Sequence, residues 1–357
     1  MTKRSKVVVA MSGGVDSSVA AALLKQQGYE VIGMMLRLWS EPGKEDSNRC
    51  CTPESMSLAG RAAAQLDIPF YVVDAKDAFR ATVVQVFLEG YGRGETPNPC
   101  LECNRMIRWT FLLEHARALG ADLMATGHYA RLQPDRTGRV RLLRAVDSSK
   151  DQSYVLHVLT QEQLRRAMFP VGEYQKTEVR TLAEALSLPM ARRHDSQDLC
   201  FLAGGDYRDF LRRHRPEMLV PGEIVDVKGS VLGEHNGLAN YTIGQRKALH
   251  VHSPVPMYVI RKDVQGNRLL VGTQMDLGTD SLTAGDVNWL SGEPMLVPFR
   301  AQVKTRYTAA EQSALVTPLG AGRSVRIAFD EKQRDITPGQ AAVFYVEQAV
   351  LGGGIIQ

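Results

Sequence analysis

The stretch Lys6-Val-Val-Val-Ala-Met11, followed by Ser12-Gly-Gly-Val-Asp-Ser-Ser18, decides the fold. The first part is a short apolar run typical of a buried strand. Helical spacing of Ala, Leu and Val from Ser17 to Gln27, ended by Gly28, predicts a helix after it. Small residues between a strand and a helix let backbone N–H groups turn inward beside the positive end of the helix. We therefore predict a phosphate-binding loop at the start of an α/β unit.

The first two hundred residues continue this alternation of short apolar runs and helical patterns. Such alternation is typical of β-α-β units, whose strands form a parallel sheet with helices on both faces. We predict an α/β domain with a doubly wound parallel sheet, whose ligands bind beyond the carboxyl ends of the strands. Its further elements are strands at 31–38, 70–73 and 122–126 and helices at 53–66 and 107–119.

After about residue 210 the pattern changes to short alternating runs separated by glycine and proline. This change is typical of antiparallel β structure. The Gln265-Gly266-Asn267 segment between two such runs indicates a hairpin. Runs at 301–303, 324–329 and 341–346 predict a small barrel or sandwich. We expect a catalytic domain at 1–210, a central β-rich domain at 211–280 and a C-terminal antiparallel β-barrel at 281–357.

Composition narrows the class of protein. With 44% hydrophobic and 23% charged residues among 357, the chain is globular and not a low-complexity or disordered chain. Five cysteines exclude a disulfide-stapled secreted scaffold and favour a reducing compartment. The apolar run after the charged N-terminus ends at Ser12, too early for a signal peptide, and no stretch is long enough to span a bilayer. We expect a soluble, cytoplasmic protein.

Charge placement is more informative than the net charge of +4. Between Arg105 and Arg144 the chain carries eight arginines against Glu114, Asp122 and Asp135. This excess fits a surface that binds a polyanion, and equally a solvated helix face.

The loop is distinct from two common phosphate loops. It lacks the Gly-Lys-Ser/Thr ending of the Walker loop, whose lysine reaches the β- and γ-phosphates, and it does not match G-x-G-x-x-G. The alternative is a tight strand-to-helix turn that needs small residues. Asp16 would face the phosphates only if Mg²⁺ or a hydrogen bond offsets the like-charge repulsion. It also fits a helix N-terminal carboxylate that stabilises the dipole.

Three cysteines lie in polar surroundings. Cys103 precedes the helix predicted at 107–119, where the helix dipole and Arg105 would favour a thiolate, and Cys200 follows Asp195-Ser-Gln-Asp-Leu. The Cys100-x-x-Cys103 spacing fits a metal ligand pair, but no second close pair exists, so no zinc site is predicted. Three thiolates could hold three irons of a four-iron cluster, and this alternative stays open. Cys50 and Cys51 have no assigned role.

The chain resembles the bacterial tRNA-specific 2-thiouridylases, a family of pyrophosphatase-loop ATPases. The resemblance rests on motifs spread over nearly the whole chain: Ser12–Ser18, Asn98-Pro-x-x-x-Cys103-Asn, Ala125-Thr-Gly-His-Tyr129, Asp147-x-x-Lys-Asp-Gln-Ser-Tyr154, Asp195-Ser-Gln-Asp-x-Cys200-Phe, Gly244-Gln-Arg-Lys247, Lys304-Thr-Arg-Tyr307, Thr337-Pro-Gly-Gln340 and Leu351-Gly-Gly-Gly-Ile-Ile356. It implies an adenine nucleotide alpha hydrolase-like catalytic domain. It also implies ATP-dependent 2-thiolation of the tRNA wobble uridine, by adenylation of O2 and sulfur transfer from a cysteine persulfide.

The resemblance also assigns residues. Cys103 corresponds to the catalytic cysteine, Cys200 to the persulfide-bearing cysteine, and the two would end as a disulfide; Asp16 would serve at the phosphates. ATP, with Mg²⁺, would be bound by Ala10, Met11, Ser12, Gly13, Gly14, Val15, Asp16, Ser17, Leu36 and Gly127. The tRNA contacts would be Asn98, Pro99, Cys100, His128, Lys150, Asp151, Gln152, Arg306, Tyr307 and Gln340.

Some of these assignments have alternatives. His128 also fits a core histidine, and Arg306-Tyr307 an ordinary barrel strand. The family usually has aspartate where this chain has Cys100, which leaves the acid/base role there open and adds to the iron-sulfur alternative.

Two other functions fit the loop. One is a different adenylating enzyme, such as an amidotransferase-type synthetase or a lysidine-forming enzyme, without cysteine chemistry. The other is a non-catalytic RNA-binding or redox-sensing module. The expected partners are the tRNA anticodon region and a sulfur-donor protein, such as a cysteine desulfurase or sulfur-relay protein. We expect the protein to be a monomer that does not associate with a membrane. The sequence identifies neither the donor nor the set of tRNAs.

Overall fold

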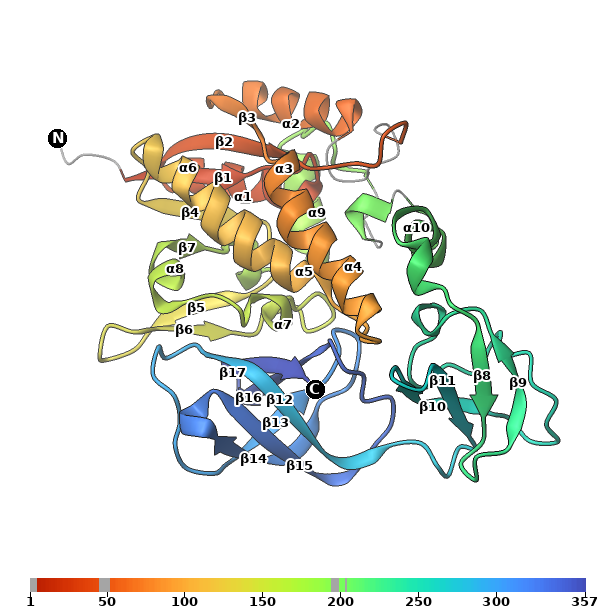
Figure 1. Ribbon diagram of the computed structural model, residues 1–357. Coiled ribbons are helices and arrows are strands. Elements are labelled where there is room, and N and C mark those ends of the chain that lie inside the picture. Colours follow the sequence, from red (N-terminus) through yellow and green to blue (C-terminus); the bar gives the residue numbers. More distant parts are fainter. Residues whose placement is uncertain (1–4, 45–51, 194–198, 203) are drawn as a thin grey trace.

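The computed structural model describes residues 5–44, 52–193, 199–202 and 204–357. A parallel sheet with its helices occupies the upper part of Figure 1, a barrel lies below it, and a smaller sheet lies to the right. Cys50, Cys51 and Asp195–Asp198 of the sequence motifs lie outside the described residues. Within the described ranges, no helix combines the length and the apolar character needed to cross a bilayer.

The upper sheet has the strand order β3-β2-β1-β4-β7, and all its neighbouring strands are parallel. Its strands are β1 (Lys6–Ala10), β2 (Glu30–Arg37), β3 (Phe70–Asp74), β4 (Leu123–Thr126) and β7 (Ala167–Met168). The predicted parallel sheet is therefore confirmed. Strand β7 was not predicted, because two residues between helical segments carry no periodicity.

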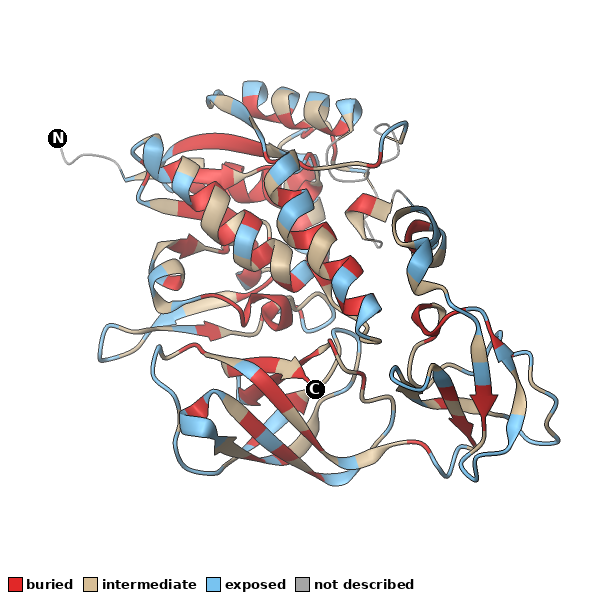
Figure 2. Cartoon of the chain, viewed as in Figure 1, coloured by how far each residue is buried: buried red, intermediate tan, exposed pale blue. Residues whose placement is uncertain are grey.

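Both faces of the central strand β1 are buried (Figure 2), as its continuous apolar sequence requires, whereas the edge strand β3 exposes Tyr71 and Val72. Val7 and Val9 pack in one core with the three helices α1 (Val15–Gln26), α2 (Pro53–Gln65) and α9 (Lys176–Ala185). Val8, between them, points to the opposite face and packs with α6 (Leu113–Ala118). The alternation follows from the two-residue period of a strand, and it confirms the doubly wound arrangement.

The strand order reverses between β1 and β4. Both strands end at the same edge, β1 at Ala10 and β4 at Thr126. In a doubly wound sheet this reversal leaves a crevice beyond the strand ends, where ligands bind. The predicted loop and Gly127 both follow directly from this point.

One long helical rod carries two of the cysteines. It consists of α5 (Pro99–Glu102), the π-helical segment η3 (Cys103–Leu112) and α6. The helix was predicted to begin near residue 107, and this was wrong: the Asn98 side chain caps it by accepting a hydrogen bond from Cys100 N, and Pro99 is its first residue. Cys103 therefore lies inside the helix, and Cys100 is nearer to the positive end.

The central part is a small sheet with the order β10-β11-β8-β9. Its strands are β8 (Gly222–Val225), β9 (Val231–His235), β10 (Tyr258–Asp263) and β11 (Arg268–Gly272). The predicted hairpin at 265–267 joins β10 to β11 as an antiparallel pair. This sheet has its own core, which includes Ile224, Val259 and Leu269.

The C-terminal strands follow the order β12-β15-β14-β13-β16-β17, and β12 also pairs with β17, which closes the sheet into a barrel. They are β12 (Thr279–Trp289), β13 (Phe299–Lys304), β14 (Gln312–Leu319), β15 (Ser324–Gln333), β16 (Ala341–Val346) and β17 (Ala349–Ile356). All neighbouring pairs are antiparallel, so the predicted antiparallel barrel is confirmed.

The barrel is built onto the catalytic part. A hairpin of β5 (Arg131–Pro134) and β6 (Val140–Leu143) follows β4 of the parallel sheet in the chain. It extends the barrel sheet, because β6 pairs with β17 (Figure 1). In β16, Ala342 and Phe344 face the barrel core, whereas Val343 and Tyr345 join the core that contains Val8 of β1. The core on one face of the parallel sheet thus continues into the outer wall of the barrel.

Short helices complete the described chain. They are α3 (Lys76–Phe79), η2 (Arg80–Val84), α4 (Gln85–Gly92), α7 (Ser153–Leu156), α8 (Gln161–Arg166), η4 (Pro170–Glu173), η5 (Cys200–Leu202), α10 (Tyr207–His214), η6 (Pro216–Met218), η7 (Leu238–Asn240) and η8 (Gly320–Gly322).

Candidate functional site

The loop after β1 is held open by small residues. Gly13 has a φ of +73°, and a Cβ on it would lie 2.3 Å from the Ser55 carbonyl oxygen, so no side chain fits there. Gly14 caps helix α1, whose first N–H groups have no partner within the helix. The Ser17 hydroxyl donates to Gly14 O (3.2 Å), and Ser12 N donates to Ser17 Oγ (3.2 Å). The loop is therefore wound around the positive end of α1, where it can hold an anion.

Gly127 lies against this loop. A Cβ on Gly127 would be 2.6 Å from Ser17 N and 2.8 Å from the Asp16 carbonyl carbon. The backbone that follows β4 therefore approaches the first turn of α1 as closely as only glycine permits. Two of the predicted ATP segments, 10–17 and 127, are thus brought together. Leu36 lies near the end of β2, partly buried against both cores of the sheet.

Asp16 is held by two side chains, Lys176 and Tyr129, that are not among the predicted site residues. Lys176 Nζ lies 2.7 Å from Oδ1 and 2.8 Å from Oδ2 of Asp16. The Tyr129 hydroxyl donates to Oδ1 at 2.9 Å. The Asp16 carboxylate thus has a cation and a neutral donor in place, which removes much of the charge conflict expected beside phosphate groups.

A second cation lies at the loop. Arg193 donates from Nη1 to the Gly13 carbonyl oxygen (3.1 Å) and from Nη2 to Ser55 Oγ (3.0 Å). The Thr52 side chain caps α2 through Ser55 N (3.1 Å), so α2 and Arg193 together fix the outer side of the loop. Neither Arg193 nor Ser55 was predicted, since both lie far from the loop in sequence.

His128 is buried, with 5% of its surface exposed. Arg108 can only donate, so its contact with Nε2 (2.8 Å) makes Nε2 the acceptor and Nδ1 the donor to Thr126 Oγ1 (2.7 Å). Burial, assisted by the Arg108 charge, holds the pKa of His128 well below its usual value. The ring is a neutral hydrogen-bonded link between β4 and the rod, and its predicted contact with tRNA stays a prediction.

Cys100 is exposed, whereas Cys103 and Cys200 are half-buried. Cys103 and Cys200 pack against the same core as α1 and α9. Next to Cys200, Phe201 is fully buried and makes edge-to-face contacts with Phe79, Phe87 and Phe210. This aromatic cluster anchors the Cys200 segment to α4 and α10.

A metal site is not assembled by these side chains. Among the described residues, no group of three His, Cys, Asp or Glu side chains is close enough to hold a metal ion.

The predicted tRNA contacts come together from two parts of the chain. Tyr307 is 39% exposed, and its ring makes an edge-to-face contact with Tyr154. Burial raises the pKa of Tyr307, and the nearby charges of Asp151 and Cys100 raise it further. Tyr307 of the barrel therefore lies beside the 150–152 segment and the start of the rod.

Three more of the predicted contacts, Asp151, Gln152 and Arg306, bond within the protein. Asp151 accepts from Ser153 Oγ (2.7 Å) and Ala145 N (3.0 Å), and Gln152 Oε1 accepts from Tyr129 N (3.0 Å). Arg306 donates to Asp335 Oδ2 (3.2 Å).

Gln340 joins the barrel to the start of the rod. Its side-chain amide donates to Thr96 O (2.7 Å), and Thr96 N donates to Pro338 O (2.8 Å). Gly339, between them, has a φ of +90° and packs against the Thr96–Pro97 backbone. The Thr337–Gln340 turn therefore braces the segment that carries Asn98 and Cys100.

Many arginines between 105 and 144 are not available as a positive patch. Arg105 pairs with Glu102, Arg139 with Glu293 and Arg144 with Glu311. Arg144 also lies 4.2 Å from the centre of the Tyr345 ring. The pairs of Arg139 and Arg144 join the hairpin region to the barrel, and that of Arg105 lies within the rod, so part of the local charge excess has a structural use.

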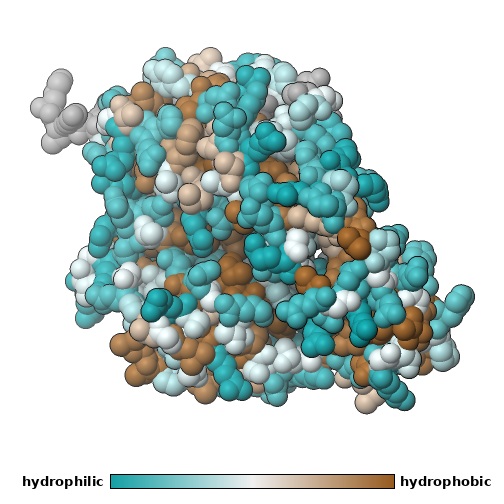
Figure 3. Space-filling view, in the orientation of Figure 1, coloured by the Kyte–Doolittle hydropathy of each residue, from teal (hydrophilic) through white to brown (hydrophobic). Residues whose placement is uncertain are grey.

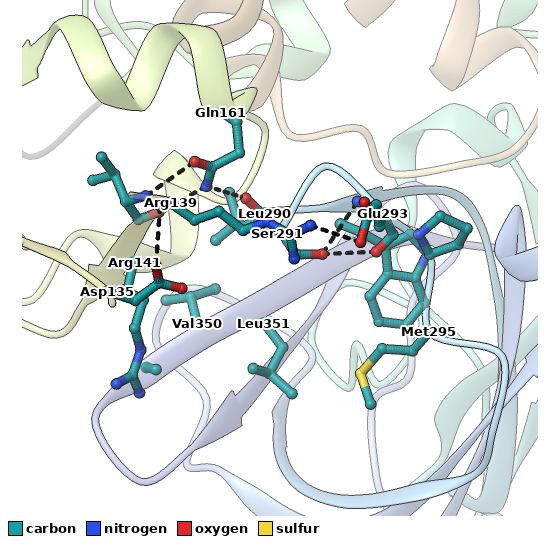
Figure 4. A pocket seen from close by; sticks show the side chains of 14 residues that line it. Asp135, Arg139, Arg141, Gln161, Leu290, Ser291, Glu293, Met295, Val350 and Leu351 are labelled. Atoms are coloured by element: carbon teal, nitrogen blue, oxygen red, sulfur yellow. Dashed lines mark hydrogen bonds and ion pairs between the residues drawn. The ribbon is translucent and has the colours of Figure 1, made fainter. Parts of the chain in front are cut away.

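A pocket between the β5–β6 hairpin and the barrel is shown in Figure 4. Within it, Gln161 donates to Val140 O (2.7 Å) and also bonds to Leu290 O. None of the predicted site residues is among those that line it. The face of the molecule in Figure 3 is mainly hydrophilic, with small scattered hydrophobic areas. We therefore place the candidate site at the loop and the rod, and not in this pocket.

The missed residues share one cause. Lys176, Arg193 and Thr96 act through contacts with residues 160, 180 and 244 positions away in sequence. A single sequence shows which residues are neighbours along the chain, but the tertiary fold decides these pairs. Tyr129 alone could have been predicted from neighbouring residues, because it follows Gly127 and His128 in the Ala125–Tyr129 motif.

Three family models match the chain: the tRNA methyl transferase HUP domain at residues 5–204, the tRNA methyl transferase PRC-barrel domain at 208–273, and the aminomethyltransferase beta-barrel domain at 279–356. Among solved structures, the chain is similar to the U34-tRNA thiolase NcsA from Methanococcus maripaludis, with 20% identity and a TM-score of 0.36 over 59% of this chain and 67% of that one. That similarity is too weak to extend the comparison.

Curated relatives match over nearly their whole length. The chain is 48% identical over 370 residues to the tRNA-specific 2-thiouridylase MnmA of Roseiflexus castenholzii, covering 99% of both chains. It is 46% identical over 366 residues to that of Desulfitobacterium hafniense, covering 100% of this chain and 99% of the relative. It is 48% identical over 354 residues to that of Chloroflexus aggregans, covering 99% and 98%. Similarity of this extent shows that the chain belongs to the tRNA-specific 2-thiouridylase family.

Proposed function

We propose that this protein catalyses the ATP-dependent 2-thiolation of the wobble uridine of tRNA. The observation that supports this most is the 48% identity to a tRNA-specific 2-thiouridylase over 99% of the chain. The glycine-lined loop at the reversal of the sheet is consistent with it, because that is where such a fold binds a nucleotide. Within this function we assign residues 1–210 to catalysis, 211–280 to a central domain and 281–357 to the barrel domain.

The loop would hold ATP with Mg²⁺. We propose that residues 10–17 surround the phosphates, with Leu36 near the adenine and Gly127 letting the backbone approach. ATP supplies the adenylyl group that turns the uridine O2 into a good leaving group, with pyrophosphate departing. Asp16 is already paired with Lys176, so the phosphates and water would supply most of the Mg²⁺ ligands.

Sulfur transfer would use Cys103 and Cys200. The terminal sulfur of a Cys200 persulfide attacks C2 of the activated uridine and displaces AMP. The Cys103 thiolate then attacks Cys200 Sγ, which breaks the S–S bond, releases the thiouridine and leaves a Cys103–Cys200 disulfide. A thiol reductant restores the two thiols.

The tRNA would lie across the start of the rod and the barrel. We propose contacts from Asn98, Pro99 and Cys100 and from the second set His128, Lys150, Asp151, Gln152, Arg306, Tyr307 and Gln340. The exposed Tyr307 ring suits stacking on an unstacked anticodon base. We propose that the enzyme acts as a cytoplasmic monomer and receives sulfur from a donor protein such as a cysteine desulfurase or a sulfur-relay protein.

The test is a thiolation assay with unmodified tRNA, ATP, Mg²⁺ and a cysteine desulfurase. We expect Cys103→Ser and Cys200→Ser to reduce 2-thiouridine, measured by mass spectrometry, to background while pyrophosphate is still released. Asp16→Ala should instead abolish pyrophosphate release. If both cysteine variants thiolate at the wild-type rate, the sulfur mechanism is wrong. If wild-type protein releases no pyrophosphate with tRNA present, the chain is a non-catalytic RNA-binding or redox-sensing module.

A further inference from the structure

The phosphate loop contains a carboxylate but no cation of its own. Ser12–Ser18 holds Asp16, and the loop lacks the lysine of a Walker loop. The fold brings a lysine to Asp16 from α9, 160 positions later in the chain. Lys176 is the first residue of that helix, and its side chain is only 10% exposed. A lysine is rarely buried to this degree unless it is paired.

Lys176 is itself fixed from several sides. Its backbone N donates to Asp147 Oδ2 (2.9 Å), and Asp147 is 7% exposed. Gln175, just before it, caps α9 together with Glu178. Lys176 Nζ also lies 5.7 Å from the centre of the Tyr129 ring, whose hydroxyl donates to Asp16. The ammonium group is therefore placed by the start of α9 and by Asp147, and it is not a mobile surface charge.

Asp16 has little freedom once this pair forms. Both Asp16 carboxylate oxygens contact Lys176. The Asp16 Cβ lies so close to Gly127 that a Cβ added to this glycine would be 3.0 Å away. A lone carboxylate in this position would repel a polyphosphate. A cation bound to both oxygens neutralises the carboxylate and keeps it turned to one side.

We infer that Lys176 is a positioning residue for ATP: it neutralises and orients Asp16 from outside the loop, so that the loop can accept the phosphate chain. This inference rests on the proposed function, which places ATP in the loop. It adds a residue from the far end of the catalytic domain to the nucleotide site.

The test compares a ligand with phosphates and one without. Dissociation constants for ATP and for adenosine are measured by calorimetry on the full chain without tRNA. For Lys176→Met we expect ATP to bind about ten-fold or more weakly, because the half-buried Asp16 carboxylate loses its cationic partner, and adenosine to change less than about two-fold. Lys176→Arg keeps the charge and should recover much of the ATP affinity.

A control variant and a double variant separate neutralisation of Asp16 from a general effect of losing a lysine. Lys25→Met removes an exposed lysine of the same helix α1 that pairs with Asp67, and it should bind both ligands like wild type. The Asp16→Asn/Lys176→Met double variant leaves no unpaired charge, so it should bind ATP more tightly than Lys176→Met alone. If it does not, neutralisation is not the role of Lys176.

The inference is overturned if Lys176→Met weakens ATP and adenosine alike, since Lys176 would then only hold the fold together. It is also overturned if ATP affinity is unchanged. These results are distinct from failure of the proposed function, in which wild-type protein would bind ATP but would not thiolate tRNA.

Discussion

Gly127 shows how one missing side chain joins two segments of the nucleotide site. The atoms that a Cβ would meet, Ser17 N and the Asp16 carbonyl carbon, belong to the backbone of α1. A backbone cannot swing aside as a side chain can, so even a methyl group would push β4 and the loop apart. The requirement for glycine here comes from close approach and not from an unusual φ angle.

We therefore expect Gly127→Ala to weaken ATP binding by about ten-fold or more, because the loop must shift to admit the methyl group. The change is checked by the ATP dissociation constant, with circular dichroism to show that the fold persists. Gly60→Ala is the matched control: in α2 its Cβ would meet nothing closer than 3.9 Å, and it should stabilise the helix by about 0.5–1 kcal/mol without changing ATP affinity. Unchanged ATP affinity in Gly127→Ala would contradict the prediction.

At the scale of elements, the rod and the barrel turn work together. The Thr337–Gln340 turn lies against Thr96 and Pro97, directly before the cap of the rod. The start of the rod, with Cys100 at its second residue and Cys103 one turn further, is thus set by a contact from the other end of the chain. The sequence placed Gln340 among the tRNA contacts, and the structure gives its amide a partner inside the protein.

We expect Gln340→Ala to speed amide hydrogen exchange at residues 95–98 by about five-fold, because it removes a hydrogen bond worth about 1 kcal/mol. Exchange is followed by mass spectrometry on the protein without tRNA. Gln302→Ala is the control, because Gln302 makes a comparable bond to Ser313 Oγ (2.8 Å) on the exposed barrel surface. If exchange is unchanged and only tRNA affinity falls, Gln340 acts purely as a tRNA contact.

The elements also show what a sequence can predict. The loop and the strand-helix order were predictable because residues next to one another in the chain form them. The start of the rod differs from the predicted start near residue 107, although an asparagine cap followed by proline, as in Asn98-Pro99, is a helix start signal. The Lys176–Asp16 pair could not be predicted, since it depends on the packing of α9 against α1.

At the scale of the whole molecule, the catalytic part and the barrel meet around His157. This residue is 1% exposed, and its ring Nδ1–H donates to Tyr154 O (2.7 Å). Its carbonyl oxygen accepts from Asn288 of the barrel (2.6 Å). Gly353 of β17 packs against the ring so closely that a Cβ would be 2.7 Å from it. Burial lowers the pKa of His157 from 6.5 to about 4.

This pKa predicts a loss of stability in mild acid. Below pH 6.5 the imidazole of the unfolded chain takes up a proton, whereas the folded one stays neutral until about pH 4, so the free energy of unfolding falls across this window. His157 alone accounts for about 3 kcal/mol of the fall. Urea titrations at pH 7 and pH 4.5 should show a smaller loss for His157→Gln than for wild type. Exposed His252→Gln should behave like wild type, and an equal loss in all three proteins would contradict the assignment.

The hairpin β5–β6 ties the catalytic part to the barrel, so the chain cannot be cut between them without exposing buried surface. Because β6 pairs with β17, and Val343 and Tyr345 complete the core behind β1, the barrel is part of the wall of the catalytic unit. A fragment cut before the barrel would keep its ATP loop but would present an unpaired strand edge and an uncovered apolar face to water. Such edges recruit strands from other chains. Residues 1–278 would therefore aggregate when expressed alone, even though they contain the whole ATP loop.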